Sequence, residues 1–205
     1  MIDIPDYEIL KKCGHGAYGE VWIARNRAGS LVALKTIEKS EQIEKELAGL
    51  RCYSRIADSP HLIRLFHIGE IGNTLYYTME LADNIGSEEL YIPATLGNLL
   101  NRKKRFTPAE TVELGEKLLS GLETLHQAGL VHRDIKPENV IIRGSEAILI
   151  DFDASRIFKS DTNQDTQILG TTGYAAPEQY GITQTDERAD IYSLGVLLNI
   201  MLTGK

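Results

Sequence analysis

The hydrophobic pattern of the chain changes its period near Leu81. From Tyr7 to Ile37, short runs of β-branched and aromatic residues such as "VWIA" and "SLVALKTI" are broken by glycines, which predicts twisted antiparallel strands. Similar runs return in "HLIRLFHIGE" and "TLYYTMEL", and helical patterns dominate afterwards. The polar stretch "ADNIGSEEL" is interpreted as a linker or an insertion between two lobes. The order of elements predicts an α+β fold with a β-rich first part and a mainly helical second part.

Three helices are predicted. Ser40 can cap a helix over residues 41–56, and residues 107–110 form a capping box with proline at the first helical position. The second helix is expected to end near Gly129. The third, over residues 189–201, is apolar on every side, which is typical of a helix buried all round.

Composition and charge exclude several classes of function. A net charge of −7 over 205 residues argues against a general nucleic-acid binder, which needs a basic surface. The basic run 102–105 is interpreted as the solvated end of a helix. The N-terminus lacks the pattern of a signal peptide, and no apolar run reaches the ~18 residues of a membrane span. Two cysteines without metal-ligand spacing favour a reducing compartment, so we expect a cytoplasmic protein.

Lys35 lies on a predicted strand, on the same face as Leu31 and Ala33. An ammonium group among apolar neighbours needs a carboxylate or an anion, because burial of an unpaired charge is costly. Glu46 falls on the inward stripe of the helix predicted for residues 41–56 and is a candidate partner. The alternative is a snorkelling lysine with a glutamate at the rim, and the residues alone leave both open.

The glycine-rich stretch "GHGAYGEV", residues 14–21, runs from one predicted strand into another. A dinucleotide-binding glycine motif should open a helix, so that interpretation is excluded. Glycines permit a tight turn whose backbone N–H groups approach phosphates closely. A plain glycine hairpin explains the same pattern equally well.

The stretch "HRDIKPEN", residues 132–139, carries the strongest chemical signal. Asp134 can accept a proton, and Lys136 can neutralise a phosphate. Asn139 and Asp151 flank the two arms of a predicted short hairpin, and their oxygen atoms suit Mg²⁺. Taken alone, a loop rich in charge and proline could be turn chemistry only.

The motifs "GHGAYGEV", "VALK", "HRDIKPEN", "DFD" and "AAPE" occur in this order, and together they resemble the signature set of protein kinases. The resemblance covers about Tyr7 to Gly204 and is closest to eukaryotic-like serine/threonine kinases of the bacterial type. It implies a two-lobed fold. The N-lobe would span residues 1–82, with a nucleotide-binding sheet and one helix, and the C-lobe 83–205, lacking its last helices.

The resemblance further implies that the chain binds ATP and Mg²⁺ and phosphorylates serine or threonine hydroxyls of proteins. The positions that match the catalytic residues are Lys35, Glu46, Asp134 and Lys136. Those that match the magnesium ligands are Asn139 and Asp151. Those that match the nucleotide pocket are Gly14, Gly16 and Gly19 in the glycine loop, Cys13, Val21, Ala33 and Ile141 around adenine, and Glu80 and Ala82 at the hinge.

Asp153 departs from the family pattern, which has glycine at this position. We interpret Asp153 as a turn residue rather than as an additional metal ligand. The departure puts activity in doubt, so one alternative is an ATP-binding pseudokinase that acts as a scaffold. A second alternative is a small-molecule phosphotransferase, against which "GTTGYAAPEQY" argues, since it resembles the peptide-substrate platform of protein kinases.

The resemblance also indicates regulation and partners. Arg133 matches the arginine that binds a phosphorylated activation loop in many kinases, with candidate phosphorylation sites at Ser160, Thr162 and Thr166. Thr171 is expected to contact Asp134 and Lys136 through its hydroxyl group. Because the family continues past "LTG" with further helices, we expect the last helix to expose an apolar face. The expected partners are therefore a protein substrate and either a second copy of the chain or the rest of a longer protein.

Overall fold

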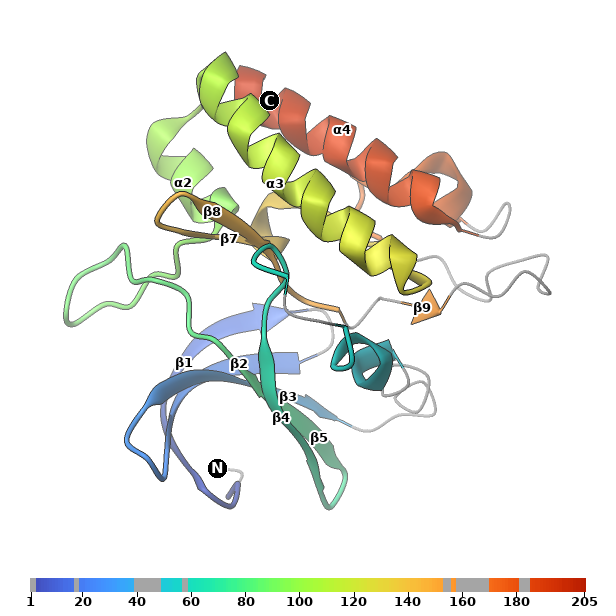
Figure 1. Ribbon diagram of the computed structural model, residues 1–205. Coiled ribbons are helices and arrows are strands. Elements are labelled where there is room, and N and C mark those ends of the chain that lie inside the picture. Colours follow the sequence, from blue (N-terminus) through green and yellow to red (C-terminus); the bar gives the residue numbers. More distant parts are fainter. Residues whose placement is uncertain are drawn as a thin grey trace.

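The computed structural model describes residues 3–16, 19–38, 49–56, 59–152, 156–157, 170–180 and 185–205. Its first part is a five-stranded antiparallel sheet in the order β1-β2-β3-β5-β4 (Figure 1). The strands are β1 (Tyr7–Gly16), β2 (Gly19–Asn26), β3 (Leu31–Glu38), β4 (Leu65–Ile71) and β5 (Thr74–Met79). The predicted β-rich first part is confirmed.

The strand predicted from His61 begins only at Leu65. The residues before it bond to the second half of the molecule instead. The backbone N–H of Ile63 donates to the carbonyl of Leu149 at 2.9 Å, and the N–H of Leu149 donates to the carbonyl of His61 at 2.9 Å. This short parallel bridge ties the sheet-bearing half to the hairpin that carries Asp151.

The helix predicted for residues 41–56 is described only in its last part. Residues 49–53 are helical, and Leu50 is fully buried there. Its capping residue Ser40 and Glu46 lie outside the described residues.

The second part of the chain is mainly helical, as predicted. Its helices are α2 (Leu96–Lys103), α3 (Pro108–Gln127) and α4 (Glu187–Thr203). Its short elements are β6 (Leu130–Val131), η1 (Pro137–Asn139), β7 (Val140–Arg143), β8 (Glu146–Leu149), β9 (Arg156–Ile157) and η2 (Pro177–Tyr180). Among the described residues, none of these helices is both long and apolar enough to cross a bilayer. Figure 1 shows α3 and α4 running side by side.

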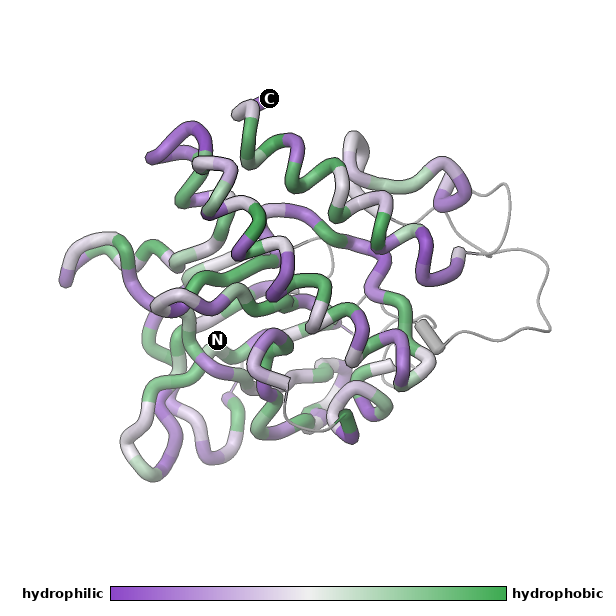
Figure 2. The backbone as a smooth tube through the Cα atoms, turned by 45° about the horizontal axis from the view of Figure 1, so that its top comes forward, coloured by the Kyte–Doolittle hydropathy of each residue, from purple (hydrophilic) through white to green (hydrophobic). Residues whose placement is uncertain are grey.

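Local signals define the ends of these helices. Thr107 accepts from the backbone N–H of Glu110 while the Glu110 side chain accepts from that of Thr107, so the predicted capping box is present. Gly129 follows α3 with φ +72°, a conformation that suits glycine. The basic run 102–105 lies at the exposed end of α2, as expected. Hydrophobic and hydrophilic residues alternate along the winding of the helices (Figure 2).

One hydrophobic core joins the inner face of the sheet to α3. Tyr77 and Met79 of β5 belong to the same buried cluster as Leu118 and Leu122 of α3. Full burial of each such side chain contributes about 1.5–3 kcal/mol, so this shared core holds the two lobes together. A second, smaller cluster lies on the opposite face of the sheet, where Tyr7 packs.

Helix α4 buries one side and exposes the other. Ala189, Leu194 and Leu197 are nearly or fully buried, whereas Ile191 and Tyr192 are each 48% exposed. The helix is therefore not buried all round, as its pattern suggested, and part of its exposed side is apolar, as expected.

Candidate functional site

A pocket with a cavity volume of about 490 Å³ lies between the sheet and the loops of the helical lobe. Sequence analysis predicted most of the residues that line it. The predicted residues found in its wall are Cys13, Gly14, Val21, Ala33, Lys35, Glu80, Ala82, Asp134, Lys136, Asn139, Ile141 and Asp151. Strands of the sheet supply one wall, and the segments around β7 and β8 supply the other.

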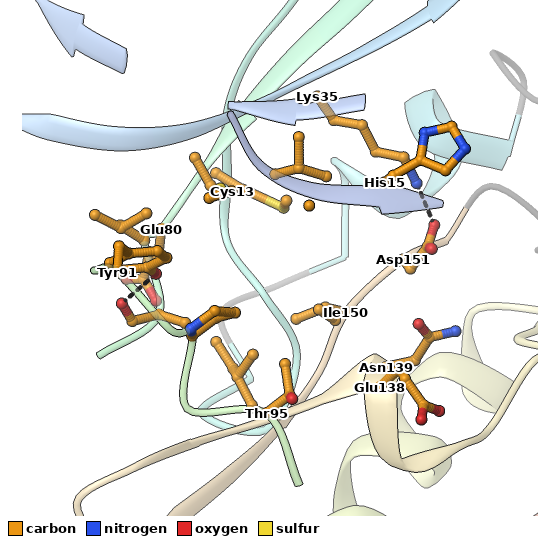
Figure 3. A pocket seen from close by; sticks show the side chains of 18 of the residues that line it. Cys13, His15, Lys35, Glu80, Tyr91, Thr95, Glu138, Asn139, Ile150 and Asp151 are labelled. Atoms are coloured by element: carbon orange, nitrogen blue, oxygen red, sulfur yellow. Dashed lines mark hydrogen bonds and ion pairs between the residues drawn. The ribbon is translucent and has the colours of Figure 1, made fainter. Parts of the chain in front are cut away.

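Lys35 is the charged group of the sheet wall. It lies in the central strand β3 and is only 2% exposed. Its Nζ lies 2.6 Å from Oδ1 of Asp151, across the pocket (Figure 3). This carboxylate offsets the desolvation of the ammonium group. The predicted pair with Glu46 stays a prediction, because Glu46 lies outside the described residues.

Asp151 and Asn139 are held next to each other by the β7–β8 hairpin. Asn139 immediately precedes β7, and one residue, Ile150, separates Asp151 from the end of β8. The backbone N–H of Ile150 donates to the carbonyl of Asn139 at 2.9 Å, which closes the open end of the hairpin. Asp151 has φ +68°, a left-handed conformation that aspartate tolerates better than most side chains.

These two side chains fit a hard divalent cation. Nδ2 of the Asn139 side chain donates to the backbone carbonyl and to Oδ2 of Asp134. Neither bond uses Oδ1 of Asn139. Amide and carboxylate oxygens are the ligands that Mg²⁺ prefers. Within the described residues, no group of three or more histidine, cysteine or acidic side chains could bind a metal ion by itself.

Asp134 forms a compact polar network with Lys136 and Thr171. The Thr171 hydroxyl donates to Oδ1 of Asp134 at 2.7 Å, and Lys136 Nζ donates to that hydroxyl at 2.9 Å. Lys136 Nζ also lies 2.7 Å from Oδ2 of Asp134. The predicted contact of Thr171 with both residues is therefore confirmed. A carboxylate next to an ammonium can orient a hydroxyl group and receive its proton.

The loop that carries Asp134 is held by Asp190, which sequence analysis missed. Asp190 is fully buried in α4. It accepts from the backbone N–H groups of His132 and Arg133 and from Nε2 of His126, each at 2.8 Å. These bonds support Arg133 in a left-handed conformation with φ +71°. A carboxylate within an otherwise apolar helix was the signal that could have identified it, since such groups are buried only when paired.

Gln179 of η2 holds the other side of the same loop. It is 2% exposed, and its Nε2 donates to the carbonyl of Arg133 at 2.7 Å. The segment that resembles a peptide platform is thus coupled to the residue next to Asp134. Arg133 itself is only 3% exposed. Its expected phosphorylated partners, Ser160, Thr162 and Thr166, lie outside the described residues.

Phe152 separates the two aspartates of "DFD" and is a core residue. Its ring stacks on that of Tyr53 at a centroid distance of 3.7 Å and packs against His132 at 4.9 Å. Nε2 of His132 donates to the carbonyl of Ile150 at 3.1 Å. The segment before Asp151 is therefore bonded to the loop before Asp134. Asp153, predicted to be a turn residue, lies outside the described residues.

Gly16 and Gly19 pair with each other between β1 and β2, and the described pocket wall does not include them. Their predicted contact with phosphates stays a prediction. Gly19 has a structural role as well. A Cβ atom at this position would lie 2.0 Å from the carbonyl oxygen of Thr36, so the close approach of β2 to β3 requires glycine.

At the hinge end of the pocket, burial raises two pKa values. The pKa of the Cys13 thiol rises from 9.0 to about 11, because desolvation disfavours the thiolate. Burial also raises the pKa of Tyr91, with smaller contributions from Cys13 and Asp83. Both groups are therefore held in their neutral forms.

Comparison with known proteins identifies the family. A family model described as "Protein kinase domain" matches residues 7–205. The chain is 32% identical over 213 residues to serine/threonine-protein kinase pkn2 of Myxococcus xanthus, covering 97% of this chain and 24% of that protein. It is 32% identical over 207 residues to serine/threonine-protein kinase PknD of Mycobacterium tuberculosis, covering 97% and 30%. The chain thus spans under a third of the length of these relatives.

Proposed function

Because the chain belongs to the protein kinase domain family, we propose that it is a serine/threonine protein kinase that transfers the γ-phosphoryl group of ATP to a protein hydroxyl. One observation carries the proposal: five side chains of complementary chemistry line one pocket. They are Lys35, Asp134, Lys136, Asn139 and Asp151.

Asp134 is the proposed base. The Thr171 hydroxyl donates to Asp134, which supports this carboxylate as an acceptor for a hydroxyl proton. In the reaction, the substrate oxygen forms a bond to the γ-phosphorus while the bond from that phosphorus to the leaving oxygen of ADP breaks. The hydroxyl proton passes to Asp134, and Lys136 neutralises charge on the transferred group.

Lys35 is the proposed contact of the α- and β-phosphates, with Glu46 as the residue that orients it. Asn139 and Asp151 would hold Mg²⁺, which, when bound, neutralises the charge of the phosphates. Because Lys35, Asn139 and Asp151 already line one pocket, catalysis would come mainly from positioning and electrostatics.

The proposed lobes are residues 1–82, which bind the nucleotide, and residues 83–205, which carry the loops for catalysis and substrate binding. Adenine would lie among Cys13, Val21, Ala33 and Ile141, with Glu80 and Ala82 bonding its edge through backbone groups. Met79 of β5 lines the same pocket and would act as the gatekeeper.

We propose that the exposed face of α4 is covered by a second copy of the chain. Ile191 and Tyr192 are each 48% exposed there, and apolar patches on a soluble domain usually mark an interface. Size-exclusion chromatography with light scattering tests this, because a monomer at high protein concentration would exclude the homodimer.

We further propose that the chain acts in the cytosol, where ATP is supplied and free thiols such as Cys13 and Cys52 persist. Immunoblotting of fractionated cells is expected to detect it in the cytosolic fraction, and recovery in an oxidising compartment would contradict this.

The function is tested by incubating the chain with labelled Mg-ATP and a generic protein substrate, beside an Asp134→Ala variant. The expected result is transfer by the wild-type chain that is lost in the variant. Nucleotide binding is measured in parallel. Binding without transfer in both proteins would instead indicate a pseudokinase, the role that Asp153 in "DFD" favours.

A further inference from the structure

The polar stretch after the hinge is an ordered hairpin, which we call the hinge hairpin (residues 83–94). A bridge joins Asn84 to Pro93, and the backbone N–H of Ile85 donates to the carbonyl of Ile92 at 2.9 Å. The side chain of Asn84 makes three further hydrogen bonds within the turn. The segment therefore has a defined shape of its own and can present a side chain at a fixed place.

The hinge hairpin contributes Tyr91 and Pro93 to the pocket wall, and Tyr91 is the one of these two with a hydrogen-bonding side chain. Its hydroxyl donates to the backbone carbonyl of Ala82 at 2.7 Å, and its ring lines the pocket (Figure 3). Near the hairpin tip, Lys11 of β1 donates to the carbonyl of Glu89 at 2.9 Å. The hinge hairpin that carries Tyr91 is therefore bonded to the hinge at Ala82 and to β1 at Lys11. Its raised pKa keeps the phenol protonated, so it remains a donor.

Ala82 is the hinge residue whose backbone, under the proposed function, bonds the edge of the base. Adenine carries an acceptor at N1 and only a hydrogen at C2, so it needs one backbone donor beside it. Guanine carries a donor at N1 and a donor amino group at C2, so it needs a backbone acceptor at the same place. Ala82 lines the pocket, and with the base bonded to its backbone as proposed, its carbonyl would be the acceptor offered to such an amino group. Tyr91 already donates to this carbonyl.

We propose that Tyr91 is a specificity-determining residue, which makes the pocket select adenine over guanine nucleotides because its hydroxyl competes with a purine amino group for the Ala82 carbonyl. The inference rests on the proposed function. A purine with an amino group at C2 has to share this carbonyl with the phenol or leave its own donor unpaired, and an unpaired buried donor is costly. Adenine makes no such demand.

The test uses displacement of a fluorescent ATP analogue by ATP and by GTP, which reports binding independently of transfer. The Tyr91→Phe variant keeps the ring and removes the donor. We expect GTP to bind this variant about three- to tenfold more tightly than it binds the wild type, with ATP affinity within about twofold, as the loss of one neutral hydrogen bond predicts. A general loss of stability would not change the ratio of the two affinities in this direction.

Tyr7→Phe is the matched control. It also removes a hydrogen-bonded tyrosine hydroxyl, which lies 3.3 Å from Oγ1 of Thr78, but on the opposite face of the sheet. This control is expected to keep the wild-type ratio. A second measurement needs no variant: ATP with an added C2 amino group should displace the analogue from the wild type less well than ATP does.

An unchanged ATP/GTP ratio in Tyr91→Phe, or equal binding of the C2-amino compound and ATP to the wild type, would overturn the inference while leaving the proposed function intact. Failure of the wild-type chain to bind any nucleotide would instead refute the proposed function, and the inference with it.

Discussion

Replacement of Asp190 by asparagine is expected to destabilise the chain by about 2–4 kcal/mol and to slow phosphoryl transfer. The Asp190 carboxylate receives three donors, two of them buried: Oδ1 accepts from the N–H of Arg133, and Oδ2 accepts from the N–H of His132 and from the partly buried ring of His126. An amide retains one oxygen, so at least one donor meets an NH₂ group. The cost combines a lost bond to a charged group, about 1.5–3 kcal/mol, with an unpaired buried donor, about 1–3 kcal/mol, part of which relaxation recovers.

The effect on transfer follows from the same contacts. Arg133 is held at φ +71° next to Asp134, so its release displaces the proposed base. Nucleotide binding depends on residues elsewhere in the pocket and should change little. The assays are urea unfolding followed by circular dichroism, the transfer rate, and nucleotide affinity.

Asp186→Asn is the matched control, because it makes the same chemical change in the same helix. Asp186 caps α4, a role that asparagine fills about equally well, and its exposed pair with Arg188 adds little. Its stability should stay within about 1 kcal/mol of wild type. If Asp190→Asn is as stable as this control and transfers phosphate at the wild-type rate, the reasoning is wrong.

Three further predictions concern single positions. Gly170 has φ +110°, and a Cβ atom there would lie 2.8 Å from Cβ of Ala175, so Gly170→Ala should lose about 1–3 kcal/mol in urea unfolding. Gly144 has φ +59° and no atom within 4 Å of an added Cβ, so Gly144→Ala should lower the free energy of unfolding by only about 1 kcal/mol. Equal losses in the two glycine variants would contradict this account. Burial raises the pKa of Cys13 to about 11, so about one thiol in a thousand is ionised at pH 8. Alkylation of Cys13 by iodoacetamide, followed by mass spectrometry, should therefore accelerate about tenfold per pH unit from 7 to 9 and be blocked by ATP; a rate that levels off below pH 9 would show an ordinary thiol. Thr107→Ala should cost about 1 kcal/mol through the lost cap of α3, and an unchanged melting temperature would count against the capping box.

Local patterns in the sequence predicted the elements, and the resemblance to protein kinases indicated most of the pocket wall. Strand and helix periods, the box at residues 107–110 and the loop "HRDIKPEN" depend on neighbours within a few residues, and such interactions can be read from one stretch of chain. The order of the motifs identified Lys35, Asp134, Asn139 and Asp151, all of which line one pocket. Sequence analysis named Glu46 as a candidate partner of Lys35, with a snorkelling lysine as the alternative, and did not predict the direct contact with Asp151.

What sequence alone could not decide were the contacts between distant segments. Lys35 and Asp151 are 116 residues apart, and Asp190 bonds a loop more than fifty residues before it. Tyr91 was part of no motif, and its importance rests on the fold of the hinge hairpin, which brings its hydroxyl to the Ala82 carbonyl. The sequence by itself determined which chemical groups the chain carries and which local elements bear them. Only the tertiary structure decided which groups meet, because the partner of a buried polar group is chosen by packing of the whole core rather than by its neighbours in the chain.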